Sequence, residues 1–275
     1  MAALSFPPRL SRGRAILAIV RRDYLVRRSY RLAIGMDLVF GVMNLLLFYF
    51  ISRTFEDAAT APLGGAPDYF AFAVVGMAVT LVVQAAITGL AVRVREEQLT
   101  GTLETLVAQP LTATEMSLGL CGVSFVFAML RTAFYLLVAG LLLGLDLAGA
   151  DWSGFAIVLL ATWPAMVSLG ILSGAVVMVV KRGQGVMGMF VFGMGLLSGA
   201  FFPVTVLPDW LEPVGAVVPT RFAYDGIRGA LYQGSGWLAD ALMLVLFGAV
   251  FLPLAILAFA AAFKAAKRSG SLSQY

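Results

Sequence analysis

Long stretches of apolar residues without charges constrain this chain more than any other feature of its sequence. A helix that crosses a hydrocarbon core of about 30 Å needs roughly 20 predominantly apolar residues. Apolar residues run through the long segments of this chain continuously, whereas strands of a membrane β-barrel would alternate. We therefore expect six membrane-spanning helices, at about residues 32–52, 70–92, 113–145, 154–180, 186–202 and 237–263.

Composition supports the same class of protein. Of the 275 residues, 61% are hydrophobic and 12% are charged, against about 45–50% and 25% in soluble domains. Little sequence remains outside the predicted spans. We expect an all-α integral membrane protein with a basic segment at 1–31, a six-span domain at 32–263 and a tail at 264–275.

Several kinds of chemistry are excluded by what the sequence lacks. It contains no His and only one Cys, Cys121, which excludes imidazole metal sites, His-based acid–base chemistry and an internal disulfide. A Gly-x-x-x-x-Gly-Lys-Ser/Thr phosphate-binding loop is also missing. We therefore expect no metal, no cofactor and no enzymatic activity of this chain by itself.

The distribution of basic residues predicts how the chain is oriented. Fifteen of the 19 Lys and Arg residues fall before span one or after spans two, four and six. By the positive-inside rule, both termini are then cytoplasmic, as expected for a bacterial inner-membrane protein. This topology explains the arginines better than nucleic-acid binding does.

An interfacial helix is expected before the first span, over residues 14–25. Ile16, Leu17, Val20 and Tyr24 share one face of it, and arginines occupy another. Such a segment lies in the plane of the lipid headgroups. A basic anchor on anionic lipid and a gating element are equally good interpretations.

Two charges within the predicted spans are candidates for a transport pathway. Intramembrane charges face a bundle interior or water, and Asp37 and Arg131 are such residues. Their estimated depths differ, so a direct pair is not expected. Arg131 is expected to line the pathway or to pair with an acceptor on another helix.

Pairs of glycines with the spacing Gly-x-x-x-Gly occur in several spans, a pattern that allows helices to approach closely. We expect them to pack helices within the chain. The pairs are Gly140/Gly144, Gly170/Gly174 and Gly195/Gly199.

A polar stretch, REEQLTGTLETLVAQPLTATE (95–115), separates spans two and three. Span two should continue through Glu97 until Gly101 breaks it, and a short helix should follow over 102–108. Thr112 and Glu115 then have the spacing of a capping box that starts span three. A helix this short is unstable alone, so the stretch is either a structured reversal or a helix that docks on a partner.

Two motifs resemble the permease subunits of type-2 ABC exporters. The pattern E-x-x-x-GTLE-x-L-x-x-x-P is carried by Glu97, Gly101, Thr102, Leu103, Glu104, Leu106 and Pro110. SGAFFPVTVLPDWLEPVGAVVPTRFAYDGIR (198–228) is similar to the family's second hallmark. The resemblance covers essentially the whole chain.

The resemblance implies a coupling helix at the first motif that docks in a cleft of a cytoplasmic ABC ATPase. Leu103 and Leu106 would be its apolar contacts, with Glu97 and Glu104 meeting basic groups. Further implied partners are a pair of ATPase subunits, which use ATP and Mg, and a second permease copy in a homodimer or a related heterodimer.

At the second motif the resemblance implies re-entrant helices between spans five and six, with an outer gate. An interfacial aromatic belt is the alternative interpretation. The gate residues would be Phe201, Phe202, Pro203, Pro208, Trp210 and Tyr224.

The function implied is ATP-driven export of a drug, lipid, lipo-oligosaccharide or lipid-linked polysaccharide. An ion-coupled secondary transporter is the alternative. It would be expected to show inverted repeats and ionisable residues at the midplane of the bilayer. Internal repeats are not evident in the sequence.

Overall fold

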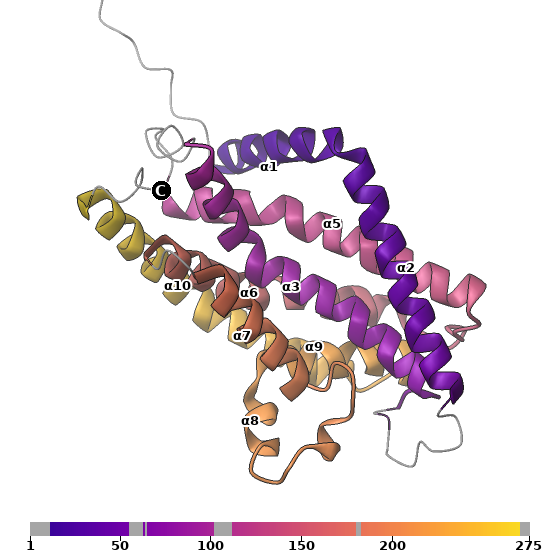
Figure 1. Ribbon diagram of the computed structural model, residues 1–275. Coiled ribbons are helices and arrows are strands. Elements are labelled where there is room, and N and C mark those ends of the chain that lie inside the picture. The colour runs from indigo at the N-terminus through magenta and orange to yellow at the C-terminus, as the bar shows by residue number, and fades with distance from the viewer. Residues whose placement is uncertain (1–11, 55–62, 64, 102–111, 180–182, 270–275) are drawn as a thin grey trace, which may run out of the picture.

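The computed structural model describes residues 12–54, 63, 65–101, 112–179 and 183–269, and all regular structure in these residues is helical (Figure 1). The long helices are α1 (Arg12–Ser29), α2 (Arg31–Thr54), α3 (Tyr69–Leu99), α5 (Ala113–Leu142), α6 (Trp152–Val179), α7 (Gly183–Leu197) and α10 (Trp237–Ser269). Between α7 and α10 lie a 3-10 turn η1 (Val204–Val206), the short helices α8 (Glu212–Val217) and α9 (Pro219–Arg228), and a π-helical turn η2 (Gly229–Gln233). The prediction of an all-α protein is confirmed.

Five of the described helices, α2, α3, α5, α6 and α10, are long and apolar enough to cross a membrane. They coincide with five of the predicted spans. The remaining prediction, a span over 186–202, is wrong in its C-terminal part, because α7 has 15 residues and ends at Leu197. At 1.5 Å per residue this helix covers about 22 Å, less than the hydrocarbon thickness of about 30 Å. The described residues thus form five candidate spans and one shorter apolar helix.

Helix α7 ends early because the residues after it form a C-terminal cap. Gly199 has a φ of +77°, which glycine adopts without steric penalty. The N–H of Ala200 donates to the carbonyl of Gly195 (3.0 Å), and the N–H of Gly199 donates to the carbonyl of Leu196 (3.5 Å). This is the Schellman pattern of hydrogen bonds. The Gly195/Gly199 pair, predicted to pack helices, therefore includes the residue that turns the chain.

The direction of α7 follows from its neighbours. Helix α6 starts beside η2, where the N–H of Asp151 donates to the carbonyl of Ala230 (2.8 Å). Helix α7 ends beside α8, since a Cβ added to Gly215 would lie 2.5 Å from the carbonyl oxygen of Leu197. Figure 1 shows α8 and α9 at one end of the bundle, and the start of α1, the ends of α3 and α10 and the start of α5 at the opposite end. Helix α7 therefore runs back toward the end where α6 begins.

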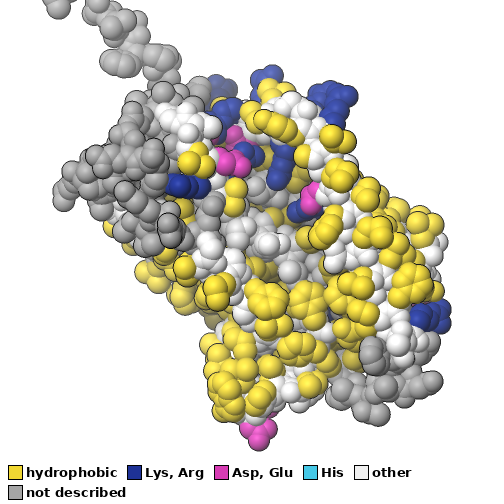
Figure 2. All heavy atoms as spheres, in the orientation of Figure 1, with side chains coloured by type: hydrophobic (Ala, Val, Ile, Leu, Met, Phe, Trp, Pro, Cys, Tyr) yellow, Lys and Arg dark blue, Asp and Glu magenta, His cyan; other side chains and the backbone are white. Residues whose placement is uncertain are grey.

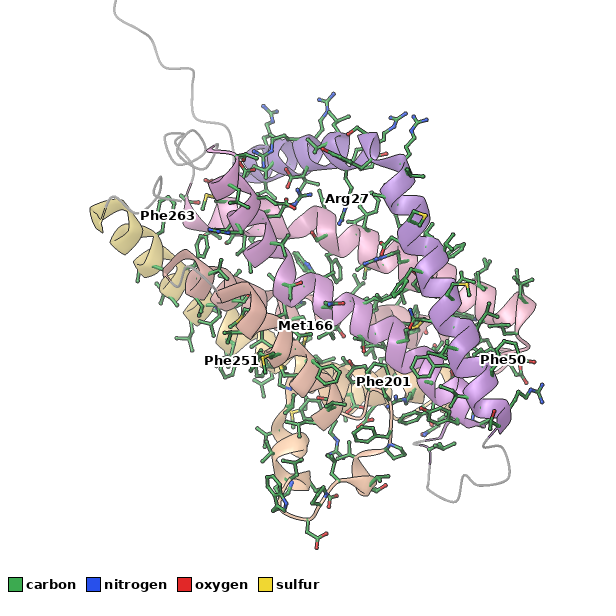
Figure 3. All side chains as sticks on the ribbon, viewed as in Figure 1. Arg27, Phe50, Met166, Phe201, Phe251 and Phe263 are labelled. Atoms are coloured by element: carbon green, nitrogen blue, oxygen red, sulfur yellow. The ribbon has the colours of Figure 1, made fainter. Side chains whose placement is uncertain are left out.

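Helix α3 is the central helix of the bundle, and α2 stands at its edge. In the most apolar 18-residue stretch of each helix, 78% of the residues of α3 are buried, but only 6% of those of α2. Figure 3 shows Met166 of α6 in the interior, with Phe50 of α2 and Phe251 of α10 pointing outward. The outward apolar side chains suit a lipid environment.

Two glycines of α6 bring it close to α3. A Cβ added to Gly170 would lie 2.0 Å from the carbonyl oxygen of Ala86, and one added to Gly174 would lie 2.8 Å from the side chain of Leu90. The predicted packing role of this glycine pair within the chain is confirmed. The Gly140/Gly144 pair is different, because Gly144 lies past the end of α5 with a φ of +75°. Only Gly140 of this pair is part of a helix.

The replacement Gly170→Ala is expected to lower the free energy of unfolding by about 1–3 kcal/mol, because the added methyl group must displace the α3 backbone. Gly188→Ala on α7 is the matched control, since nothing lies within 4 Å of a Cβ at that position. Removing an unstrained helical glycine stabilises by about 0.5–1 kcal/mol. Thermal unfolding of the purified variants makes the comparison, and equal melting temperatures would contradict the close approach of α3 and α6.

Helix α1 confirms the predicted N-terminal helix and extends beyond it in both directions. Its side chains Ala15, Ile19 and Asp23 are buried, and α5 makes room for them with glycine: a Cβ added to Gly119 would lie 2.9 Å from Ile19. Leu17 and Tyr24, which the sequence places on the apolar face, are exposed instead. Ile16 and Val20 of the predicted apolar face are half-buried, and a Cβ added to Gly122 of α5 would lie 2.9 Å from Val20. Helix α1 thus packs on the bundle along part of the predicted face.

The segment between α7 and α10 forms the predicted pair of short helices. Pro213 lies in the first turn of α8 and Pro219 in the first turn of α9, where proline costs no helical hydrogen bond. Helix α9 is largely buried against α3, α6 and α10, including Tyr224 and Arg228. The prolines therefore shape this segment into separate short helices, as expected.

Candidate functional site

The predicted ATPase-coupling segment lies between the ends of two long helices. Helix α3 continues to Leu99, and Gly101 follows it with a φ of +69°. Before α5, the hydroxyl of Thr112 accepts from the N–H of Glu115 (3.2 Å), and the carboxylate of Glu115 accepts from the N–H of Thr112 (2.7 Å). The helix extension, the glycine break and the capping box are confirmed. The motif residues Thr102, Leu103, Glu104, Leu106 and Pro110 lie outside the described residues.

Ion pairs join α1 to this end of α3. Nη2 of Arg22 lies 2.6 Å from Oε1 of Glu97 and 2.9 Å from Oδ1 of Asp23. Asp23 is 2% exposed, and its Oδ2 lies 3.9 Å from Nε of Arg93 on α3. The short contact across the two helices is that of Arg22 with Glu97, and the 3.9 Å contact of Asp23 with Arg93 lies beside it. The end of α3 next to the coupling motif is therefore tied to α1.

A cavity of about 860 Å³ opens between α1, α2, α3 and α5, and we call it the polar cavity. Figure 2 shows charged side chains gathered around a hollow at this end of the molecule, above a surface that is mostly hydrophobic. The charged side chains that line the cavity are Arg27, Asp37, Arg93, Glu96, Glu97 and Arg131, and the uncharged polar ones are Tyr30, Gln84, Thr88, Thr100 and Ser124. Apolar side chains from α1, α2 and α3 complete its walls.

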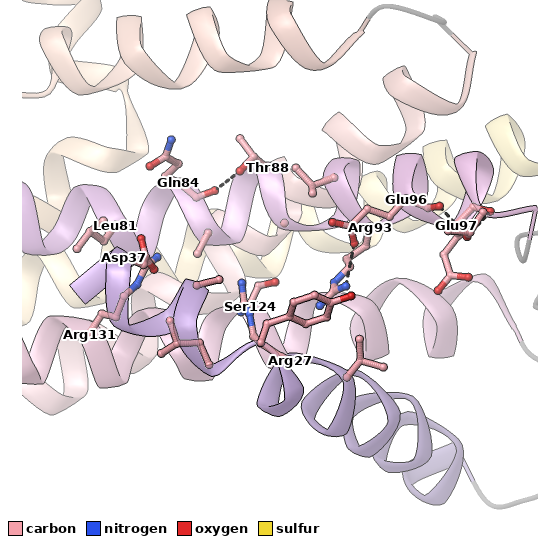
Figure 4. Close-up of a pocket in the computed structure, with 18 residues that line it drawn as sticks. Arg27, Asp37, Leu81, Gln84, Thr88, Arg93, Glu96, Glu97, Ser124 and Arg131 are labelled. Atoms are coloured by element: carbon pink, nitrogen blue, oxygen red, sulfur yellow. Dashed lines mark hydrogen bonds and ion pairs between the residues drawn. The ribbon is translucent and has the colours of Figure 1, made fainter. Parts of the chain in front are cut away.

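The two intramembrane charges predicted from the sequence meet at the edge of the polar cavity. The guanidinium of Arg131 on α5 donates to the carboxylate of Asp37 on α2 (Figure 4). The expectation that they do not pair directly is wrong, because depths counted along separate helices ignore helix tilt and the reach of a long arginine side chain. The hydroxyl of Tyr135 also donates to the carbonyl of Asp37 (3.2 Å). These contacts hold the lightly packed helix α2 against α5.

Double-mutant analysis is expected to show coupling between Asp37 and Arg131. Arg131→Gln alone leaves a carboxylate without its partner, and Asp37→Asn alone leaves a guanidinium, so each single change should lower the melting temperature. The double change removes both charges and should recover most of the loss, with a coupling energy of about 1 kcal/mol for a pair that is half-exposed. Additive losses in thermal unfolding of the purified variants would contradict the pairing.

Arg27 is the cavity arginine for which the described residues show no carboxylate partner. Its Nη1 is buried without a hydrogen-bond acceptor, and its Cζ lies 4.8 Å from the ring centre of Phe127. Burial lowers the pKa of Arg27, as do the positive charges of Arg93 and Arg131. Figure 3 shows this side chain directed from α1 toward α5.

The predicted outer-gate residues do not form one cluster. Phe201 stacks on Phe48 of α2 with ring centres 5.8 Å apart. Tyr224 is buried, and its hydroxyl shares a hydrogen bond with the hydroxyl of Thr80 on α3 (2.8 Å). Trp210 is 74% exposed. Phe202 and Pro203 are half-buried and Pro208 is exposed.

Arg228 ends the second family motif, and its contacts were not predicted from the sequence. It is 2% exposed, and its Nη2 donates to the carbonyls of Gly199 (2.9 Å) and Ala200 (3.3 Å) and to that of Phe72 on α3 (3.3 Å). Its Cζ lies 3.6 Å from the ring centre of Phe72. Arg228 therefore connects α9, the cap of α7 and α3. The sequence signal that could have identified this buried arginine is its place in a segment rich in aromatic and small residues.

Metal chemistry has no visible basis in the described part of the chain. Within these residues, no group of three or more His, Cys, Asp and Glu side chains could hold a metal ion. The polar cavity instead offers guanidiniums, carboxylates, hydroxyls and an amide, which are groups that bind polar molecules through hydrogen bonds and charge.

The described residues thus form a multi-pass helical bundle with a charged cavity at one end and the largely buried helix α9 at the other. Residues 14–232 match the family described as ABC-2 type transporter. The chain belongs to this family. It is the transmembrane component of an ABC-2 type transporter, and the matched region is a permease domain that works with ABC ATPase partners. No curated protein matches the chain.

Proposed function

We propose that this permease exports an amphipathic or hydrophobic substrate, powered by ATP hydrolysis on a separate ABC ATPase. The observation that carries the proposal is the GTLE motif within a family match that covers most of the chain. The motif follows directly after α3, the most buried span, and directly before α5. A force applied to it would reach the centre of the bundle.

Coupling is proposed to run from the ATPase through the motif to α1 and α3. Leu103 and Leu106 provide apolar contacts for a cleft on the ATPase, and Glu104 provides a charge. The ion pair of Arg22 with Glu97 supports this route, since it joins α1 to the end of α3. Movement of α1 and α3 changes the walls of the polar cavity, to which both helices contribute.

The proposed assembly is a pair of permeases with a pair of ATPase subunits in a bacterial inner membrane. Affinity purification from the native membrane in mild detergent, followed by mass spectrometry of the intact complex, tests it. The expected result is an ABC ATPase in equal number with the permease. Recovery of the permease without any ATPase, under conditions that preserve other membrane complexes, would contradict the proposal.

The proposed orientation places both termini and the coupling segment in the cytoplasm. Single cysteines introduced at Glu104 and at Trp210, in a Cys121→Ser background, are expected to react differently with an impermeant maleimide in intact cells. The exposed position 210 should be labelled from outside, and position 104 should be labelled only after the cells are broken. Labelling of position 104 in intact cells would overturn this orientation.

A further inference from the structure

We infer that the polar cavity binds the anionic headgroup of an amphipathic molecule, with Arg27 as the residue that contacts the headgroup and apolar chains lying along α2. This inference rests on the proposed function and specifies its substrate class. The simplest headgroup that fits is a phosphate, which accepts hydrogen bonds through several oxygens and matches the planar donor array of a guanidinium.

Three arginines and three carboxylates line the cavity, and Arg27 is the arginine among them for which the described residues show no carboxylate at ion-pair distance. Figure 4 shows Arg131 with Asp37 at one side and Arg93 with Glu96 at the other, with Arg27 between them. Nη1 of Arg93 lies 2.8 Å from Oε2 of Glu96, and Glu97 is occupied by Arg22 at 2.6 Å. Each of these carboxylates already has an arginine partner. An incoming anion would therefore find Arg27 available without breaking an ion pair.

One amino group of the half-buried Arg27 has no hydrogen-bond acceptor among the described residues, and an anion would supply one. A desolvated donor without an acceptor is unfavourable, and Nη1 of Arg27 is such a donor. Arg93 and Arg131 act on Arg27 as positive charges, and Asp37 and Glu96 act on it as negative ones, so the attraction for an anion rests on the guanidinium of Arg27 itself. Cζ of Arg27 lies 4.8 Å from the ring centre of Phe127, a distance at which a cation–π contact holds the guanidinium in place.

The size and composition of the cavity fit a headgroup larger than phosphate alone. A volume of about 860 Å³ lies in the range of small-molecule sites. Hydroxyls of Thr88 and Ser124 and the amide of Gln84 line it, and such groups bind hydroxylated headgroups. The lining part of α2, at Ala33 and Ile34, continues into an outward face with Met36 and Phe40 at 63% and 70% exposure. Apolar chains attached to a headgroup in the cavity have a path along this face.

Binding of a fluorescent short-chain phosphatidic acid to the purified full-length permease tests the inference, with fluorescence anisotropy as the readout. The comparison probe is the diacylglycerol with the same chains, which lacks the phosphate. Wild type is expected to bind phosphatidic acid at least tenfold more tightly than diacylglycerol. Arg27→Gln should weaken phosphatidic acid binding about tenfold or more, the usual loss for one charged hydrogen bond, and leave diacylglycerol binding unchanged.

Arg28→Gln is the matched control, because it removes the same charge from the neighbouring exposed position of α1. It should bind phosphatidic acid as wild type does. Arg27→Lys keeps the charge and should bind with intermediate affinity. Equal losses in Arg27→Gln and Arg28→Gln would show only a general attraction of α1 for anionic lipid and would overturn the inference, as would equal binding of the two probes by wild type.

The headgroup could belong to the transported substrate or to a lipid that stays in the bilayer, and a second measurement distinguishes the two. Phosphatidic acid should stimulate ATP hydrolysis by the permease–ATPase complex in phosphatidylcholine vesicles if it resembles the cargo, and should bind without stimulation if the site holds a resident bilayer lipid. Both results require the anion site at Arg27. The binding assay uses no ATPase, so loss of the site and failure of the proposed ATPase partnership are distinguishable.

Discussion

Replacement of Arg228 by leucine is expected to lower the free energy of unfolding by about 2–3 kcal/mol, because carbonyl oxygens that lose a charged hydrogen-bond donor remain buried without a partner. The carbonyls of Gly199 and Ala200 would lose their guanidinium donor, and leucine has no group that can replace it. The cation–π contact with Phe72 would also disappear. Because these contacts join three elements, the cap of α7 should loosen first.

Arg221→Leu provides the matched control for this prediction. Arg221 lies on the same helix, and its side chain is 30% exposed, with Nε 3.3 Å from Oδ2 of Asp225. Its loss should cost about 1 kcal/mol or less. Thermal unfolding of the purified proteins compares the two variants, and Arg228→Lys should fall between them because an ammonium lacks the planar donor array. Equal melting temperatures for Arg228→Leu and Arg221→Leu would contradict the assigned role.

The second large effect is expected in the coupling segment. Leu103→Asp places a charge where we propose an apolar contact with the ATPase, and Glu104→Arg reverses the charge beside it. Both variants should insert and fold normally, because the helices on either side are held by their own contacts: α3 by the bundle, and α5 by its capping box. ATP hydrolysis stimulated by the permease is expected to fall at least tenfold, with loss of copurified ATPase.

Glu212→Arg makes the same charge reversal as Glu104→Arg at the opposite end of the bundle, on the exposed side of α8. It should copurify with the ATPase and stimulate hydrolysis as wild type does. If Leu103→Asp and Glu104→Arg both stimulated ATP hydrolysis as wild type does, the coupling role would be contradicted, and the segment would only connect α3 to α5.

The helices were predictable because their signals are local. Uninterrupted apolar runs set the positions of α2, α3, α5, α6 and α10, and the Thr112/Glu115 spacing set the start of α5. The end of α7 was not predictable in this way. A glycine spacing such as Gly195/Gly199 occurs both in helix packing and in helix termination, and only the hydrogen bond from Ala200 to Gly195 distinguishes the two.

The contacts of the site were less predictable because they join residues far apart in the chain. Asp37 and Arg131 were correctly selected as unusual charges in apolar segments, but their pairing depends on how α2 leans on α5. The same limit applies to Asp23, which is buried and faces Arg93 of α3. Arg27 is one of eight arginines in a basic N-terminal segment, and nothing in its local sequence distinguishes it from Arg28.

The central claim is that ATP hydrolysis by a partner subunit drives substrate out of the cell through this chain. The most direct measurement is uptake of a fluorescent amphipath into inside-out vesicles that contain the permease and its ATPase. We predict uptake that requires ATP, persists when ionophores remove proton and sodium gradients, and disappears in Leu103→Asp. Uptake that follows an imposed proton or sodium gradient and proceeds without ATP would contradict the account.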